Sequence, residues 1–349
     1  MINATLEKID QELLNILQRE FPLVERPYLT IGNLLKISES EVINRIEKLK
    51  GTVIRQISAI FDTKSLGYES SLVAANVNPN LIDKVASIIN QHPGVTHNYQ
   101  RNHEYNLWFT IAVPPDSLLG LEKTVNILGK LAGVNSVRLL PTLKVYKIGV
   151  QLDMTGEKTS EKTNTQYYSE NSRKKVTYKL DGEDIEIIKL LQKDFLIVPR
   201  PFDNLANEVG LSVEELLNKT RIYKENGLMR RLAAVLYHRE AGFNGNGMGA
   251  WSVQEDQQEE IALKMSSYQA VSHCYLRPTY PDWPYNIFTM VHAKDNQQVE
   301  EIIKNIEMET GIKDRFVLYS IKEYKKTRLL YFDSGIDIWE RELISSLKG

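Results

Sequence analysis

Two stretches of the chain carry the same polar pattern beside a predicted strand. "GVTHNYQRNHEYNLWFT" begins at Gly94 and "AVSHCYLRPTYPDWPYNIFTM" begins at Ala270. Each contains a His, a Tyr two residues later and an Arg two residues after that: His97, Tyr99 and Arg101, and His273, Tyr275 and Arg277. Alternate side chains of a strand point to one face, so each triad is predicted to share a face. Because polar groups buried without partners are costly, this pattern indicates a satisfied structural network, a solvated face, or a pocket for a polar, anionic, aromatic-sized ligand.

The composition excludes several classes of protein. The chain has 349 residues, a formal net charge of −2 and a pI near 6.4, which gives no general affinity for nucleic acid or anionic membranes. Cys274 is the single cysteine, so an intrachain disulfide and a multi-cysteine zinc site are excluded and a reducing compartment is favoured. No long apolar run and no signal-peptide pattern is present, and we expect a cytoplasmic protein without a membrane segment.

The duplication extends far beyond the two triads. "DQELLNILQREFPLVERPY" from Asp10 matches "DIEIIKLLQKDFLIVPRPF" from Asp184, and "IRQISAIFDTKSLGY" from Ile54 matches "MRRLAAVLYHREAGF" from Met229. The two copies therefore align almost without gaps over a domain-sized length, unlike the short period of a solenoid. Between them, residues 153–175 are rich in Thr, Ser, Asn and Lys and nearly lack aliphatic residues, which predicts a flexible linker.

Within each copy the hydrophobic period changes from helical to strand-like. Three helices come first, the third opened by Ser38 with Glu41 at capping-box spacing, and a β-β-α-β-β-α-β pattern follows. This predicts an α+β protein, a tandem duplication of a helix-turn-helix (winged-helix) module followed by a ferredoxin-like α/β sandwich. The predicted segments are helix-turn-helix modules at 1–62 and 179–238, ferredoxin-like domains at 63–150 and 239–330, a linker at 151–178 and a C-terminal helical tail at 331–349.

DNA binding is the ordinary function of a helix-turn-helix module. Each third helix, however, balances three acidic against three basic residues, in "SESEVINRIEKLK" and in "SVEELLNKTRIYKEN". A recognition helix is usually basic because phosphate neutralisation supplies most non-specific affinity. We therefore expect no nucleic-acid partner.

The pattern resembles the Lrp/AsnC family, and within it most closely the siroheme decarboxylases in a form that fuses two related subunits. The stretches that carry the resemblance are "FPLVERPY" with "FLIVPRPF", "HPGVTHNYQRNHEYNLWFT", and "VSHCYLRP" followed by "WPYNIFTMVH". The resemblance implies a carboxy-lyase that removes CO2 from two acetate side chains of siroheme to give 12,18-didecarboxysiroheme, in alternative haem or modified-haem biosynthesis. The alternatives are an Lrp/AsnC-type transcription regulator that senses a tetrapyrrole or amino acid, and a non-catalytic tetrapyrrole carrier.

Siroheme carries eight carboxylates around a flat macrocycle, so a site for it needs guanidinium groups and aromatic surfaces. The protonation that follows decarboxylation needs an acid that titrates near neutral pH, which favours histidine. The candidate catalytic residues are His97, His103, His273, Arg101 and Arg277. The candidate substrate-binding residues are Arg26, Arg55, Tyr99, Tyr105, Arg200, Arg230, Arg231, Tyr275, Trp283 and Tyr285.

For the arginines before prolines, Arg26 and Arg200, a structural capping role is the alternative, and for the strand aromatics it is packing in the core. No protein-held metal and no added cofactor is predicted, because the macrocycle is its own electron sink; ligation of the siroheme iron by a pocket histidine is a secondary possibility. The two halves are expected to form an intramolecular pseudo-dimer, which could associate further into a homo-oligomer.

The copies also differ. The second is four residues longer around "PDWP", where a pocket wall and a simple turn are both open, and His292 aligns with Ala112. The divergence suggests that one copy is catalytic and the other supports it, without showing which.

Overall fold

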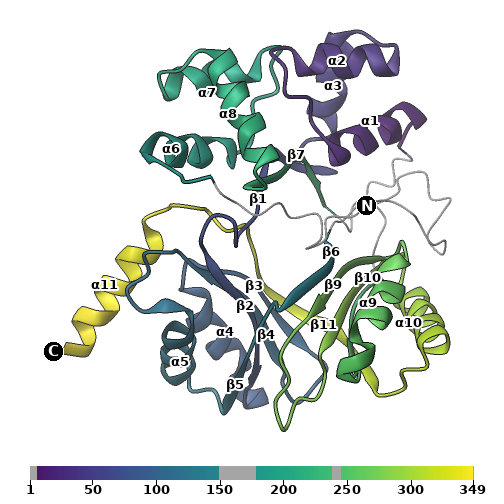
Figure 1. Cartoon of the computed structure of the whole chain (residues 1–349), viewed down its shortest axis with the longest axis vertical. Coiled ribbons are helices and arrows are strands. Elements are labelled where there is room, and N and C mark those ends of the chain that lie inside the picture. Colours follow the sequence, from purple (N-terminus) through teal and green to yellow (C-terminus); the bar gives the residue numbers. More distant parts are fainter. Residues whose placement is uncertain (1–5, 149–177, 238–244, 349) are drawn as a thin grey trace. The chain divides into compact units, whose positions relative to one another are not determined.

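A computed structural model describes residues 6–148, 178–237 and 245–348, which form two compact units (Figure 1). One unit holds the described residues up to Ser65 and between 178 and 237. The other begins at Leu66 and takes in the described residues up to 148 and from Gly245 onward. Nearly all of the predicted linker lies outside the described residues.

The first unit contains two three-helix modules, each followed by one strand. The elements are α1 (Lys8–Arg19), α2 (Pro27–Leu35), α3 (Glu39–Leu49) and β1 (Ile54–Phe61), then α6 (Gly182–Leu191), α7 (Pro201–Glu208), α8 (Val213–Glu225) and β7 (Met229–Leu236). Ser38 caps α3 by accepting from the Glu41 backbone N–H at 3.2 Å, as predicted, and Ser212 with Glu215 forms a full capping box at α8. β1 and β7 pair antiparallel, so a two-stranded ribbon joins the two copies.

The second unit contains the strands and helices of both predicted sandwiches. The first copy supplies β2 (Glu69–Asn76), α4 (Ile82–Asn90), β3 (Val95–Arg101), β4 (Leu107–Val113), α5 (Gly120–Ala132), β5 (Ser136–Pro141) and β6 (Lys144–Ile148). The second copy supplies β8 (Gly245–Trp251), α9 (Gln258–Ser267), β9 (Val271–Leu276), β10 (Ile287–Ala293), α10 (Asn296–Thr310), β11 (Arg315–Lys326) and the tail helix α11 (Gly335–Lys348). The predicted fold class, a duplicated helix-turn-helix module and ferredoxin-like sandwich, is confirmed.

Each copy sends its last strand into the sheet of the other copy. The hydrogen-bonded order in the described residues is β5-β2-β4-β3-β11-β8-β10-β9-β6. The first part of β11 pairs with β8 of its own copy, and the part from Ser320 to Lys326 pairs with β3 of the first copy. In the same way β5 pairs with β2, whereas β6 pairs with β9 of the second copy. The sequence pattern predicted β5 and β6 as one strand, but the structure interrupts it at residues 142–143 where the chain changes sheets.

A lysine fixes each crossing strand to a helix of the other copy, and of the two Lys147 is buried and Lys325 is half-buried. Lys147 of β6 donates from Nζ to the Tyr268 carbonyl at 2.6 Å, just after α9, and Lys325 of β11 donates to the Asn90 carbonyl at 2.9 Å, where α4 ends. A cation is favourable at a helix C-terminus, where carbonyl groups lack intrahelical partners. Burial lowers the pKa of both amines, that of Lys147 to about 7.

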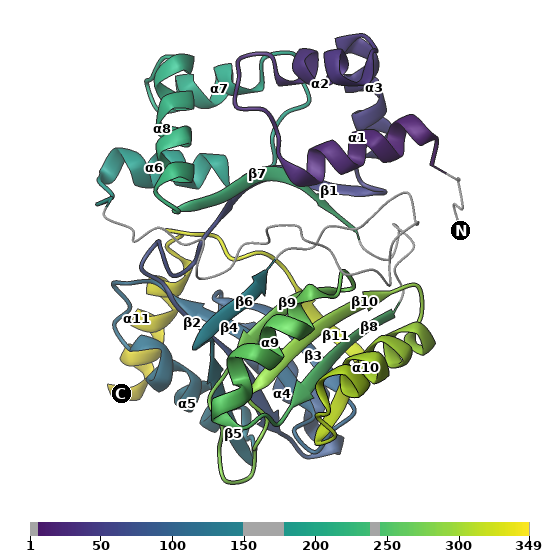
Figure 2. The ribbon, with the colours of Figure 1, turned by 45° about the vertical axis from the view of Figure 1, so that its right-hand side comes forward.

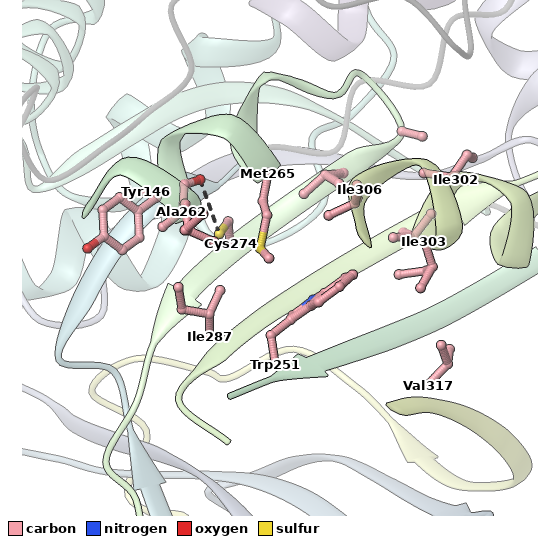
Figure 3. Close-up of a cluster of buried hydrophobic side chains, with 14 of the residues drawn as sticks. Tyr146, Trp251, Ala262, Met265, Cys274, Ile287, Ile302, Ile303, Ile306 and Val317 are labelled. Atoms are coloured by element: carbon pink, nitrogen blue, oxygen red, sulfur yellow. Dashed lines mark hydrogen bonds between the residues drawn. The ribbon is translucent and has the colours of Figure 1, made fainter. Parts of the chain in front are cut away.

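Three apolar clusters fill the second unit. One lies between the first copy's strands and α4 and α5, and a second lies between the second copy's strands and α9 and α10 (Figures 2 and 3). Cys274 is fully buried in the second cluster, as expected for a residue facing away from His273 and Tyr275. The third cluster includes Trp108 of β4, on the strand face turned away from the helices, and Trp283 from the loop between β9 and β10, so it draws residues from both copies. The two copies therefore share this third cluster, which is called the shared core.

The C-terminal tail folds back on the first copy. Trp339 of α11 packs edge-on to His92, with ring centroids 4.5 Å apart. Glu340, 1% exposed, accepts from the Leu118 backbone N–H at 2.7 Å and from the Ser117 hydroxyl, just before α5 begins. The tail of the second copy is thus attached to the first copy, in addition to the crossing strands. Among the described helices, none is long and apolar enough to cross a membrane.

Replacement of Glu340 by Ala is expected to destabilise the second unit by about 1–3 kcal/mol, because it removes the acceptor of a buried N–H and a hydroxyl. Chemical denaturation followed by circular dichroism measures this change. Glu342→Ala, an exposed change on the same helix, is the control and should stay within about 0.5 kcal/mol of wild type. Equal effects of the two substitutions would contradict the role given to Glu340.

A second prediction concerns pH. Burial, and to a lesser degree Lys325, lowers the pKa of His92 to about 4 from an ordinary value of 6.5. The unfolded chain therefore binds a proton first, and the folded state should lose stability as the pH falls from about 6.5 to about 4, by up to about 1.4 kcal/mol per pH unit. His92→Asn keeps an acceptor for the Gly94 backbone N–H but does not titrate.

Urea unfolding at several pH values in this window should give a shallower slope for His92→Asn than for wild type, even though its stability at pH 7 is lower. Comparing the two proteins removes the contribution of the carboxylates that titrate in the same range. Identical slopes would show that His92 is accessible to protons in the folded state.

Candidate active site

In each copy the His, Tyr and Arg side chains of the predicted triad follow one another in a row along the strand. These two rows of side chains are called the ladders. In β3 the rings of His97 and Tyr99 are 6.3 Å apart, and Arg101 Cζ lies 5.5 Å from the Tyr99 ring centroid. In the second copy, His273 and Tyr275 are 5.8 Å apart and Arg277 Cζ, just after β9, lies 4.9 Å from the Tyr275 ring. The prediction that each triad shares one face is confirmed.

Both ladders lie on the sheet face turned away from the helices. Tyr99 pairs across the sheet with Trp108, and Tyr275 pairs with Phe288, and both partners belong to the core that the copies share. His97 and His273 are half-buried, so the histidine end of each ladder is the accessible end. Each ladder, together with the residues paired with it on the neighbouring strands, forms a polar site that is called a corner. One corner is at β3 and the other is at β9.

The arginines at the inner ends of the ladders bind main-chain carbonyls of the other copy. Arg101, 6% exposed, donates from Nη1 to the Leu318 carbonyl of β11 at 2.9 Å, and Arg277, 8% exposed, donates to the Leu140 carbonyl of β5. Burial lowers the pKa of each guanidinium to about 10, so both stay charged at neutral pH. The Nε of each is buried without a hydrogen-bond partner in the described structure. Each arginine therefore links the two copies and keeps one donor unused.

A neighbouring hydroxyl orients each histidine. Ser272 Oγ lies 2.8 Å from His273 Nδ1 and also donates to the Met290 carbonyl at 3.2 Å. A hydroxyl has one proton, so Ser272 accepts from Nδ1–H, which leaves the lone pair of the neutral ring on Nε2. In the first copy Thr96 Oγ1 lies 3.1 Å from His97 Nδ1, and its hydroxyl also contacts that of Thr110.

His103 is placed differently from the other two candidate acids. It lies in the turn between β3 and β4, and its Nδ1 accepts from the Tyr105 backbone N–H at 3.1 Å. Its ring stacks on Phe316 at 4.7 Å and meets Trp283 edge-on at 5.4 Å, and burial lowers its pKa. Tyr99 and Arg101 separate His103 from His97 along the chain, and its ring contacts are with the aromatic residues Phe316 and Trp283. Its role as an acid stays a prediction.

The four extra residues of the second copy close this end of the shared core. Trp283 is 1% exposed, and Asp282 accepts from the Tyr105 hydroxyl at 2.6 Å and from Arg138 Nε at 2.9 Å. Tyr285 is partly buried and packs on Phe316 at 4.6 Å. The insert is therefore a tight turn, closed by the bridge between Tyr280 and Trp283, that binds the first copy. Tyr105, Trp283 and Tyr285 lie beside this turn, and their contact with a ligand stays a prediction.

The five remaining candidate arginines lie in the first unit, and three of them pair with acids. Arg26 pairs with Glu39; Arg200 pairs with Glu25 at 2.7 Å and Asp203 at 2.8 Å; Arg230 pairs with the buried Asp62 at 3.0 Å. Arg55 and Arg231 are half-buried at opposite ends of the β1–β7 ribbon, and burial lowers the pKa of Arg231. The binding of a substrate by these five arginines stays a prediction.

Sequence reasoning missed two kinds of residue. Lys326 is the cross-strand partner of His97, although it lies in the other copy and 229 positions away. Asp282 and Arg138 form an ion pair at 2.6 Å that connects the insert to β5. No local pattern marks either pair, because both depend on strands that cross between copies. Among the described residues, no cluster of three or more His, Cys, Asp or Glu side chains could hold a metal ion.

Family models match both copies. An AsnC-like ligand binding domain matches residues 65–147 and 240–325, and a siroheme decarboxylase NirDL-like helix-turn-helix domain matches residues 10–55 and 184–230.

The siroheme decarboxylase of Hydrogenobacter thermophilus is 37% identical over 336 residues, which cover 96% of this chain and 98% of that protein. The beta subunit of the siroheme decarboxylase of Methanosarcina barkeri is 38% identical over 148 residues, which cover 42% of this chain and 97% of that subunit. The crystal structure of the siroheme decarboxylase NirDL in co-complex with an iron-uroporphyrin III analogue matches with a TM-score of 0.74 and 33% identity, over 98% of this chain and all of that one. With two matching halves, two polar corners and similarity along almost its whole length, the chain belongs to the siroheme decarboxylase family.

Proposed function

We propose that this protein removes CO2 from two acetate side chains of siroheme and releases 12,18-didecarboxysiroheme. The observation that carries the proposal is the pair of His-Tyr-Arg ladders, each with an unused buried guanidinium donor, in a chain 37% identical to a siroheme decarboxylase over nearly its full length. The iron-uroporphyrin III analogue bound to the NirDL relative supports an iron tetrapyrrole as the ligand class.

The residues supply binding and proton transfer, and the substrate supplies the electron sink. When the C–C bond to the carboxylate breaks, its electron pair moves into the protonated pyrrole system and CO2 leaves. The remaining methylene then takes up a proton to become a methyl group, and the ring gives back its extra proton. Arg101 and Arg277 would orient the acetate through Nε, since a guanidinium suits a carboxylate. The neighbouring hydroxyls contact Nδ1, so Nε2 of His97 and of His273 would first take up a proton from solvent and then deliver it to the methylene. No added cofactor enters this scheme.

The proposal also covers assembly. The exchanged strands make the chain an intramolecular pseudo-dimer, and the beta subunit from Methanosarcina barkeri aligns with about half of it, which supports a fused origin. Further association into a homo-oligomer and a cytoplasmic location stay predictions from the sequence.

The helix-turn-helix modules are proposed to act as scaffold. Arg45 of α3 bonds to Glu7 and Asp10 at 2.9 Å and to Glu41 at 2.7 Å, and Lys219 of α8 bonds to Glu183 at 2.6 Å. Cations neutralised in this way are poorly placed to displace counterions from DNA, so a transcription regulator is the less favoured function.

Anaerobic incubation of the purified protein with siroheme, followed by mass spectrometry of the tetrapyrrole, is expected to show the loss of two molecules of CO2. Siroheme that co-purifies with the protein but keeps its mass would contradict the proposal and favour a carrier or a sensor. Duplex-binding assays over a series of salt concentrations would then separate those two functions.

Single replacements of His97 and His273 by Asn test the acids. Loss of a general acid is expected to lower kcat by about 100-fold or more for at least one of the two decarboxylations, with a smaller change in siroheme affinity. His92→Asn is the control at pH 7, because His92 lies on the helix side of the first copy. If His97→Asn and His273→Asn both turn over siroheme at the wild-type rate, neither histidine is the acid, and His103→Asn becomes the decisive variant.

A further inference from the structure

The crossing strand β11 adds side chains of the second copy to the first copy's ladder. Residues directly opposite in an antiparallel pair lie on the same sheet face, and here Lys326 is opposite His97, Glu323 is opposite Tyr99, and Ser320 is opposite Arg101. The polar corner at β3 is therefore built from both copies.

The contacts of the neighbouring lysine confirm which way Lys326 points. Lys325 is paired with Asn98, and both side chains bond to Asn90 of α4, on the helix side of the sheet. The next residue of an extended strand faces the other way, so Lys326 lies on the ladder side with His97. Its side chain is exposed, as a binding group for a ligand from solution requires.

The equivalent corner in the second copy has a different chemistry. There the crossing strand is β6, and it places Ile148 opposite His273 and Val145 opposite Tyr275. Both residues are apolar, and Val145 is buried. The first corner thus contains two cations, Lys326 and Arg101, with Glu323 as its one acid, whereas Arg277 is the one charged group among the paired residues of the second corner.

We propose that Lys326 binds a carboxylate of the tetrapyrrole substrate beside His97, so that the corner at β3 is the one that holds the charged rim of the substrate. An ammonium on a flexible stem suits a substrate with many carboxylates, because it follows whichever side chain is presented. Arg101, held by the Leu318 carbonyl, offers a fixed donor at the other end of the same ladder. The inference rests on the proposed substrate, but it concerns binding and is measured separately from decarboxylation.

The test is an anaerobic absorbance titration of the full-length protein with siroheme at low and high salt. Lys326→Gln is expected to raise the Kd about tenfold at low salt, with a smaller ratio at high salt because exposed charges are screened. Lys322→Gln is the matched control: it is on the same strand, faces the helix side and pairs with Asp83 at 2.8 Å. Lys326→Arg, which keeps the charge, should bind within about threefold of wild type.

The assignment to the first corner is tested by placing the same charge in both corners. Lys326→Glu should weaken binding far more than Ile148→Glu, and equal losses would overturn the assignment. A Kd for Lys326→Gln within twofold of wild type would overturn the role of Lys326 itself. If wild type binds siroheme without releasing CO2, the proposed reaction fails, while the ratio of Kd values still decides whether Lys326 binds the substrate.

Discussion

The exchange of terminal strands is the constraint on which the second unit depends. β6 and the end of β11 complete the sheet of the opposite copy, and a lysine fixes each of them to a main-chain carbonyl where a helix of that copy ends: Lys147, which is buried, and Lys325, which is half-buried. The buried Arg101 and Arg277 bind carbonyls of the other copy that come shortly before the chain crosses. A buried cation without such a partner would cost several kcal/mol, so these contacts are satisfied together only when both copies are in place. The ladders that form the candidate site are therefore organised by the association of the two halves.

Local features of the site were predictable because they depend on neighbours in the sequence. The spacing of His97, Tyr99 and Arg101 predicted a shared face, and Ser38 with Glu41 predicted the start of α3. The duplication and the order of helices and strands likewise predicted the fold class.

The features that were not predictable are those set by strand register between the copies. Lys326 faces His97 because β11 crosses to β3, and a periodic pattern in β11 cannot name its partner strand. The role of the insert was left open for the same reason: its turn is attached to the other copy through the contacts of Asp282 with Arg138 and Tyr105. His103 illustrates the opposite case, since its residue type suggested an acid while its stacking on Phe316 places it among core aromatics.

Duplication followed by divergence accounts for the unequal corners. Both copies keep the ladder and the lysine at the helix end, which are the parts that the exchanged strands require. The residues that differ, Lys326 against Ile148 and His292 against Ala112, lie on the ladder face and are not needed to hold the strands. The helix-turn-helix modules fit the same account, because the β1–β7 ribbon joins the two copies while acids neutralise cations of α3 and α8. The contacts between the copies already hold the crossing strands. The exposed end of the first ladder can therefore bind substrate charge through Lys326, while the second ladder can have the apolar Ile148 and Val145 opposite it without loss of the fold.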